Sequence, residues 1–372
     1  MPADSRMLVV EEPGLVGFRP APPETRPEDG TFDVEAVYSG LSAGTELAFV
    51  KGTHPQLTRG WDAELGLFGE AGAPAGYPVL RWGYLQVGRI VASRTPAFGT
   101  GELVAMTYGH REHYRADPLA DRVVVLPDDL DPVLGIYVAH MGPICANGLL
   151  HAAAELHGAG VRSLGDGVAG LRVAVTGAGV VGLLTAMFAR THGAREVVVV
   201  DPTPQRREVA GKLGFATLDP ETEDVATVLK TRWRHRPGDR GADVVFQCRG
   251  QAASLGLALR LLRPQGTVID LAFYQAGADA LRLGEEFHHN GLSLRCAQIG
   301  RMPRGLAHTW DRERLSAETI GLLRAECDAI RQHLITDLVP IEDAPELITA
   351  IAERRRHVLQ AVFTFPTSPT TR

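Results

Sequence analysis

The chain has 372 residues, of which 45% are hydrophobic and 22% are charged, and its formal net charge at pH 7 is −6. This composition is ordinary for a globular protein, but the length exceeds what one compact core usually holds, so we expect two domains. The acidic balance makes nucleic acid a poor partner. Residues 1–10 lack a signal-peptide pattern and no apolar stretch resembles a membrane span, so we expect a cytoplasmic protein with no membrane partner.

The cysteines and the one basic run indicate no special compartment or partner. The basic run from Lys230 to Arg240 is typical of a solvated helix end and loop, although a contact for a phosphate group or a partner is an alternative. The cysteines are too far apart in sequence for a CxxC zinc knuckle or a redox dithiol, which fits a reducing compartment. They are Cys145, Cys248, Cys296 and Cys327.

The first 150 residues are rich in short β-like runs that Gly and Pro separate, which predicts a compact, mostly β domain. A helical stretch follows at about Leu134 to Leu156, and Asp166 with Gly167 then indicates a turn. The predicted strands of this first part are Phe32–Tyr38, Leu85–Ala92, Leu103–Thr107 and Asp121–Leu126.

From Leu171 onward, apolar strands alternate with amphipathic helices, which predicts a parallel sheet covered on both faces. The predicted strands are Arg172–Thr176, Glu196–Val200, Asp243–Gln247, Gly266–Ala272 and Leu292–Gln298, and the helices are Val180–Thr191, Arg206–Leu213 and Ala252–Leu262. The tail is helical from Ser316 and ends in a strand at Val358–Phe365.

A glycine motif between the first of these strands and its helix indicates a dinucleotide site. Gly177 permits the tight turn, Gly179 lets a pyrophosphate approach the backbone, and Gly182 lets helix and strand pack closely. The helix that begins with Val180 and Val181 offers free N–H groups and partial positive charge to phosphates. The alternative is a glycine turn in an α/β fold that binds no nucleotide.

An acid at the end of the next strand indicates which dinucleotide is bound. Asp201 stands nineteen positions after Gly182, where a carboxylate accepts hydrogen bonds from ribose hydroxyls and repels a 2′-phosphate. We therefore predict NAD as the cofactor. Arg206 and Arg207 lie nearby, so NADP is the alternative.

The order of these parts resembles the medium-chain dehydrogenase/reductase superfamily over nearly the whole chain. Four segments resemble the branch typified by bacteriochlorophyllide a dehydrogenase, namely Ser39–Glu46, Gly83–Arg89, Phe287–His288 and Ala297–Gly300. The resemblance implies an α/β protein with a GroES-like, mostly β catalytic domain at 1–150, completed by 301–372, and a Rossmann domain at 151–300. It also implies a homodimer in which Leu292–Gln298 pairs across a two-fold axis.

Zinc-dependent members of the superfamily hold a catalytic metal through three positions, and none of them carries a zinc ligand here. The first position is Ser42 or Ala43, the second is Tyr84, and the third falls near Gly142 and Pro143. A catalytic zinc needs three thiolate, imidazole or carboxylate ligands, so we expect no zinc. A replacement site is the alternative, built from His110, His113, His140 or His288.

Without zinc, a hydrogen-bond donor must polarise the carbonyl group of the substrate. Tyr84 takes the place of a zinc-binding histidine and is the first candidate, with an aromatic plug as its alternative. Thr45 aligns with the hydroxyl that passes the proton in relatives, although Gly-Thr-Glu is also typical of a structural turn. His110 is a candidate general acid/base, with a surface-loop histidine as the rival reading.

The substrate pocket predicted from the resemblance uses six further residues. Tyr108 falls where relatives place a pocket-lining aromatic, and the others lie in the branch segments or near the domain junction. The set is Glu46, Tyr108, His140, Asn147, His288 and Gln298.

Reversible oxidation of a secondary alcohol to a ketone, on a small-molecule substrate with NAD, is the leading functional prediction. The first rival is NAD(P)H-dependent reduction of an activated C=C bond, of the enoyl or quinone reductase type. The second rival belongs to another class, a dinucleotide-binding sensor or scaffold without turnover.

Overall fold

The structure is a computed structural model that describes residues 5–23, 25–26, 29–69, 73–279 and 281–366. The chain divides into two compact units. The first contains residues 1–140 and 335–372, and the second contains residues 141–334. Among the described residues, no helix is both long enough and apolar enough to cross a membrane.

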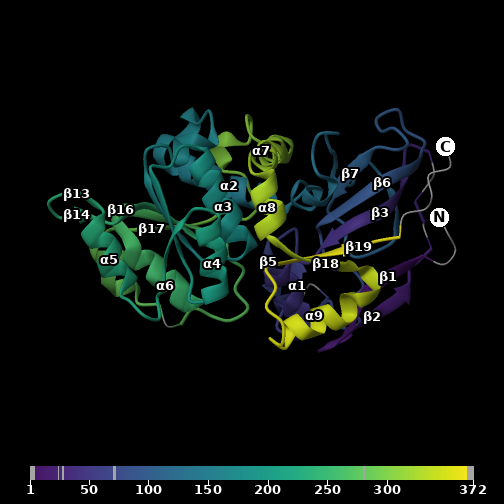
Figure 1. Cartoon of the computed structure of the whole chain (residues 1–372), viewed down its shortest axis with the longest axis horizontal. Helices are drawn as coiled ribbons and strands as arrows, with labels where there is room; N and C mark the ends of the chain where they lie inside the picture. The colour runs from purple at the N-terminus through teal and green to yellow at the C-terminus, as the bar shows by residue number, and fades with distance from the viewer. Residues whose placement is uncertain (1–4, 24, 27–28, 70–72, 280, 367–372) are drawn as a thin grey trace. The chain divides into compact units, whose positions relative to one another are not determined.

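The first unit is built on a seven-stranded sheet in which β18, β19, β3, β6, β7 and β9 follow one another and β8 also pairs with β3 (Figure 1). The tail strand β19 lies antiparallel to β3, with Val362 opposite Gly40. The sheet strands are β3 (Phe32–Gly40), β6 (Gln86–Ser93), β7 (Leu103–Met106), β8 (His113–Ala116), β9 (Val123–Val125), β18 (Ile335–Pro340) and β19 (Gln360–Thr364).

Two hairpins and two helices complete the first unit. One core cluster joins the β1–β2 hairpin to α1, α9 and β19, and a second cluster packs β3, β6, β7 and β8 together. Strand β3 contributes to both clusters, with Phe32 and Val34 in the second and Ala36 in the first. The elements are β1 (Arg6–Glu12), β2 (Leu15–Pro20), α1 (Ala43–Val50), β4 (Gly60–Asp62), β5 (Leu67–Gly69) and α9 (Ala344–Ala352).

The second unit has the predicted parallel sheet, in the order β12, β11, β10, β15, β16, β17. Its inner strands are apolar because helices cover both faces, as Figure 1 shows. The strands are β10 (Arg172–Thr176), β11 (Glu196–Val200), β12 (Ala216–Leu218), β15 (Ala242–Gln247), β16 (Leu262–Asp270) and β17 (Ser293–Cys296). The helices are α2 (Met141–His157), α3 (Val180–Thr191), α4 (Pro204–Lys212), α5 (Val225–Arg232), α6 (Ala252–Leu261), α7 (Arg312–Ala325) and α8 (Cys327–His333).

The units differ from the expected domains in where they begin and end. The helical stretch expected from Leu134 is interrupted, because a 3₁₀ helix spans Pro132–Tyr137 and α2 begins only at Met141. Helices α7 and α8 lie in the second unit, although the resemblance placed residues 301–372 with the first domain. The reason is close packing of α7 on α2, where a Cβ on Gly142 would lie 2.1 Å from the Thr319 Cγ2 atom.

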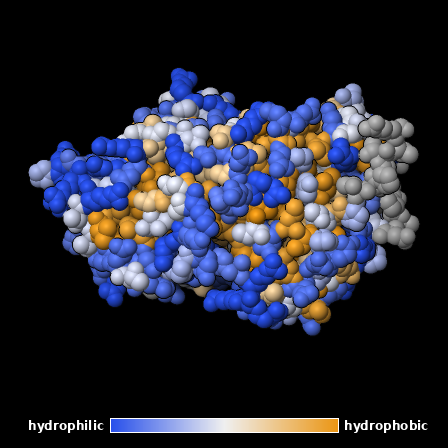
Figure 2. All heavy atoms as spheres, viewed as in Figure 1, coloured by the Kyte–Doolittle hydropathy of each residue, from blue (hydrophilic) through white to orange (hydrophobic). Residues whose placement is uncertain are grey.

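The basic run forms the end of α5 and a small hairpin, β13 (Arg234–Arg236) with β14 (Asp239–Arg240). Figure 2 shows hydrophilic residues over this hairpin, at the left of the view. Arg232 pairs with Glu196, and the Arg236 Nε atom lies 3.3 Å from Asp239. These ion pairs favour the interpretation of the basic run as a solvated surface segment, although part of it is a hairpin and not a loop.

Candidate functional site

The glycine turn of the second unit has the geometry that a dinucleotide requires. Gly177 has a φ of +103°, which only glycine adopts without strain, and a Cβ on Gly182 would lie 1.7 Å from the Gly177 carbonyl oxygen. By contrast, a Cβ on Gly179 would have only the Arg206 Nη1 atom within reach, at 3.9 Å. The turn therefore needs glycine at its two ends and leaves the backbone open at Gly179, where α3 begins.

Asp201 braces this turn from the end of β11. Its side chain is fully buried, and its two oxygens accept hydrogen bonds of 2.8 Å from the Ala178 and Thr203 N–H groups. The Arg206 Nη1 atom lies 3.9 Å from the same carboxylate, and the buried Arg206 Nε has no partner among the described residues. Arg206 is thus the cation beside the open glycine, while Asp201 supplies negative charge beneath it.

A polar network at the carboxyl ends of the central strands was not singled out from the sequence. The Gln247 side chain accepts hydrogen bonds from the Thr176 and Ser254 hydroxyls and donates one of 3.1 Å to the Tyr274 hydroxyl oxygen. Tyr274 in turn donates to Asp270 over 3.0 Å, and burial raises the pKa of the Asp270 carboxyl above its ordinary value. Ligands of parallel α/β sheets bind at the carboxyl ends of the strands. Polar residues at the ends of the predicted strands could therefore have indicated this network.

The structure brings together two of the predicted residues near β17. Asn147 on α2 is fully buried, and its Nδ2 donates a hydrogen bond of 3.2 Å to the Gln298 carbonyl oxygen. Its Oδ1 has no partner among the described residues. The Gln298 side chain is exposed and accepts from the Gly300 N–H group at 2.7 Å. His288 is exposed and lies edge-on to His289, so it does not join this pair.

In the first unit, Tyr84 and Ser42 form a hydroxyl pair. The Tyr84 hydroxyl is hydrogen-bonded to the Ser42 Oγ atom, and either oxygen can be the donor. Ser42 precedes α1, while Tyr84 precedes β6 and is half-buried. The His140 ring lies 4.4 Å from the Tyr84 ring between centroids. Tyr84, at the second zinc position that the resemblance implies, is therefore hydrogen-bonded to Ser42, one of the two residues given for the first position.

Behind this pair lies a buried histidine–glutamate contact. His110 is 2% exposed, and its Nε2 atom lies 2.8 Å from Glu46 Oε2 while its Nδ1 atom lies 2.6 Å from the Ser39 Oγ. The other Glu46 oxygen accepts a hydrogen bond of 3.0 Å from the Ser42 N–H group. The reading of His110 as a surface-loop residue is wrong, because the ring is buried. Both ring nitrogens are occupied, which favours a positioning role over that of a general acid.

Thr45 and Tyr108 lie away from the hydroxyl pair's hydrogen bonds. Thr45 stands in the first turn of α1, where its N–H donates to the Ser42 carbonyl oxygen at 3.1 Å, as in a structural turn. The Tyr108 hydroxyl donates to Asp121 at 2.5 Å, and its ring stacks on Tyr114 with centroids 4.0 Å apart. Tyr108 therefore belongs to a separate pocket of the first unit.

The donors at the zinc positions do not fit zinc. Zinc sites in proteins use thiolate, imidazole or carboxylate ligands, and a Ser–Tyr hydroxyl pair offers none of these. The nearest imidazole and carboxylate, in His110 and Glu46, bind each other. Among the described residues, no group of three or more His, Cys, Asp or Glu side chains has the arrangement of a metal site.

Comparison with known proteins gives relatives that are dehydrogenases. Residues 180–310 match the family described as "Zinc-binding dehydrogenase". The chain is 28% identical to D-guloside 3-dehydrogenase of Escherichia coli K12 over 315 residues, which are 82% of this chain and 83% of that protein.

Solved structures give the same picture of the fold. The structure of 2R,3R-butanediol dehydrogenase from Bacillus subtilis has a TM-score of 0.71 at 17% identity and covers 98% of this chain and 100% of its own. A short chain alcohol dehydrogenase from E. coli CFT073, complexed with NADH, has a TM-score of 0.71 at 14% identity with the same coverage. These likenesses confirm the predicted α/β fold, with a GroES-like part and a Rossmann sheet.

Proposed function

We propose that this chain is a member of the medium-chain dehydrogenase/reductase superfamily and that it interconverts a secondary alcohol and a ketone with NAD and without a catalytic zinc. Its relatives are dehydrogenases of sugar derivatives and alcohols, which confirms the prediction of an alcohol–ketone oxidoreductase. The zinc-free mechanism, the choice of NAD and the kinship with the bacteriochlorophyllide a dehydrogenase branch are the parts of the proposal that go further.

The observation that carries the zinc-free mechanism is the hydroxyl pair of Tyr84 and Ser42. A carbonyl oxygen that gains negative charge during hydride transfer needs a donor at hydrogen-bond distance. The Tyr84 hydroxyl can be this donor, while Ser42 orients it. In the alcohol-oxidising direction the Tyr84 oxygen would accept the alcohol proton as its own proton passes to the Ser42 hydroxyl, which would release its proton to solvent from this half-buried site.

Glu46 and His110 would act as positioning residues. Glu46 holds the Ser42 N–H group with one oxygen and the His110 ring with the other, so the loop that carries Ser42 is tied to the buried core. Hydrogen bonds of this kind fix rotamers around a site without touching the substrate. The proton path does not need to pass through His110, because Glu46 binds the Ser42 backbone and not its hydroxyl.

The residues of the second unit fit a nicotinamide dinucleotide, which would supply the hydride acceptor or donor when bound. Gly179 and the first turn of α3 would bind the pyrophosphate, with Arg206 beside it. The buried Asp201 carboxylate puts negative charge beside the glycine turn, and a carboxylate at the end of this strand would disfavour a 2′-phosphate, which supports NAD over NADP.

Replacement of Tyr84 by Phe tests the mechanism. We expect kcat to fall by about 10²- to 10⁴-fold, as loss of a general acid does, while the affinity for NADH stays unchanged. Tyr137→Phe is the matched control, since the buried Tyr137 hydroxyl has no partner among the described residues and its loss should cost no activity. A Tyr84→Phe enzyme with full kcat on every secondary alcohol tested would refute the assignment of Tyr84.

Metal analysis and assays with a panel of substrates distinguish the proposed function from its alternatives. Stoichiometric zinc in active protein, or loss of activity with a chelator, would refute the zinc-free mechanism. Turnover of an activated enone with NADPH, without turnover of alcohols, would favour the C=C reductase. Binding of NAD with no turnover of any substrate would favour a sensor or scaffold.

We also propose that the protein is a cytoplasmic homodimer joined through β17. This strand is the edge of the parallel sheet and all four of its residues are exposed, with Leu294 at 43%. An uncovered apolar edge is an aggregation hazard that pairing would remove. Light scattering should give a dimer at micromolar concentration and a monomer for Leu294→Lys. A wild-type monomer would contradict the proposal.

A further inference from the structure

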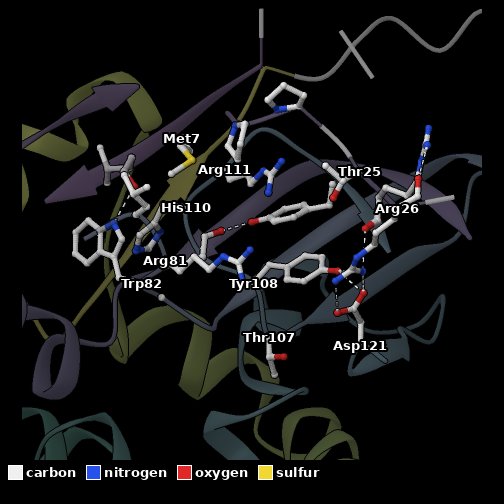
Figure 3. A pocket seen from close by; sticks show the side chains of 18 residues that line it. Met7, Thr25, Arg26, Arg81, Trp82, Thr107, Tyr108, His110, Arg111 and Asp121 are labelled. Atoms are coloured by element: carbon white, nitrogen blue, oxygen red, sulfur yellow. Dashed lines mark hydrogen bonds and ion pairs between the residues drawn. The ribbon is translucent and has the colours of Figure 1, made fainter. Parts of the chain in front are cut away.

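A separate cavity of about 500 Å³ lies in the first unit beside β7 and β8. Its walls come from β1, from Pro22, Pro23, Thr25 and Arg26, from Leu80–Gly83, and from residues 107–111 and 114–115 (Figure 3). Among the described residues, four arginines and one carboxylate line it, so this part of the lining carries more positive than negative charge. The charged side chains are Arg26, Arg81, Arg111, Arg115 and Asp121.

Two of these arginines are already neutralised by carboxylates. Arg26 pairs with Asp121, which also accepts the Tyr108 hydroxyl, and Arg115 donates to Asp33 from its Nε at 2.8 Å. Burial raises the pKa of Asp121, but hydrogen bonds from Arg26 and Tyr108 outweigh it and the net pKa is below the ordinary value. The Arg26–Asp121 pair is therefore charged and fixed near neutral pH.

Arg81 and Arg111 carry the excess charge. Arg81 is exposed and makes no hydrogen bond or ion pair with any described residue. The Arg111 guanidinium lies over the Tyr114 ring, 5.1 Å from its centroid, and its buried Nε finds no acceptor within the described part of the chain. A buried N–H group without an acceptor is costly unless a ligand or water supplies one. Figure 3 shows the Arg111 side chain pointing into the cavity.

The remaining walls would hold an organic molecule and not only an inorganic ion. Tyr108 and Tyr114 form a stacked pair whose interplanar angle is 19°, and Trp82 is held by a hydrogen bond of 2.8 Å from its Nε1 to the Leu8 carbonyl oxygen. The cavity volume exceeds that of a single phosphate and falls within the range of small-ligand sites. Rigid aromatic walls with two free cations are typical of sites for anionic organic molecules.

We propose that this cavity binds a small organic anion through its carboxylate or phosphate group, with Arg111 and Arg81 as the binding cations. Guanidinium groups bind both oxyanions in a bidentate manner. The site is distinct from the glycine turn, which lies in the other unit. It is also distinct from the Tyr84–Ser42 pair, neither member of which lines the cavity. His110 lines the cavity and also binds Glu46, so it joins the wall of this cavity to the residue that positions Ser42.

Calorimetric titration of the whole chain tests the proposal without need of turnover. The probes are D-gluconate, inorganic phosphate and neutral D-glucitol, in a buffer low in chloride. We expect gluconate or phosphate to bind and glucitol not to bind. Arg111→Gln and Arg81→Gln should each weaken binding of the anion by roughly tenfold, as the loss of a charge-assisted hydrogen bond does.

Arg236→Gln is the matched control, because it removes one exposed cation of the basic run in the other unit. It should bind the anion like the wild type. Arg81 is exposed, so its variant keeps the test valid even where Arg111→Gln fails to fold. Binding of gluconate alone would assign the site to carboxylates, and binding of phosphate alone would assign it to phosphates. Anion affinity that is absent in the wild type, or unchanged in both arginine variants, would overturn the proposal.

Discussion

Replacement of Gly182 by Ala tests the glycine turn on which dinucleotide binding depends. The added Cβ would lie 1.7 Å from the Gly177 oxygen and 2.9 Å from the Gly177 carbonyl carbon. The shortest distance that real Cβ atoms show is 3.0 Å, and the obstacle here is backbone, which cannot rotate away. The first turn of α3 must therefore move from the loop by about 1.3 Å.

The displacement has two measurable consequences. Overpacking of this kind costs about 1–3 kcal/mol, and each kcal/mol lowers the melting temperature of a domain of this size by about 2–4 °C. The displaced N–H groups are those proposed to bind the pyrophosphate, and every 1.4 kcal/mol that they lose is about tenfold in affinity. We expect NADH to bind at least about tenfold more weakly. Calorimetric titration and differential scanning calorimetry measure both effects.

Gly211→Ala is the matched control in the same unit. Gly211 lies in α4, and a Cβ there would have no atom within 4 Å. Alanine is the better helix former, so this variant should gain about 0.4–1 kcal/mol and bind NADH unchanged. A Gly182→Ala protein with wild-type melting temperature and wild-type NADH affinity would refute the geometry of the turn.

Two further variants probe buried polar groups. Asp270→Asn should be more stable than the wild type at neutral pH. Burial raises the pKa of Asp270 in the folded state, so wild-type stability falls relative to Asn over the pH range above the ordinary carboxyl pKa of about 4. Urea unfolding across that range measures the difference, and a gap that does not widen with pH would contradict the prediction. Glu46→Gln removes the charge from the buried contact with His110 and should lower the free energy of unfolding by about 1–3 kcal/mol. Unchanged stability together with unchanged kcat would show that Glu46 does not position the Ser42 loop.

The glycine turn could be predicted from the sequence because its requirements are local. Gly177, Gly182 and the strand and helix around them lie within a few positions of one another, and the structure has the tight turn at Gly177 and the close approach at Gly182. Asp201 was predicted at the end of its strand as well. What the sequence did not indicate is that its carboxylate turns inward to the Ala178 N–H group, since that contact depends on the pairing of β10 with β11.

The residues missed or misplaced are those whose partners lie far along the chain. His110 was predicted as a general acid/base with a surface-loop histidine as the rival, because nothing within a few residues of it indicates burial. Its neighbours Ser39 and Glu46 are 71 and 64 positions away. The network of Gln247 and Asp270 was missed for a related reason: strand ends were predicted, but not which of them would adjoin.

The hydroxyl pair lies between the features that the sequence predicts and those that it does not. The resemblance pointed to Tyr84 and to Ser42 or Ala43 as zinc positions, yet Ser42 and Tyr84 are 42 positions apart and no spacing rule joins them. The antiparallel register does join them, since β3 pairs with β6 so that Ser39 lies opposite Gln86. The chain leaving β3 and the chain entering β6 are therefore adjacent at one sheet end, and Ser42 and Tyr84 stand on them. A register shift of two residues would separate the pair, so the register of β3 and β6 supports the proposed chemistry as much as either hydroxyl does.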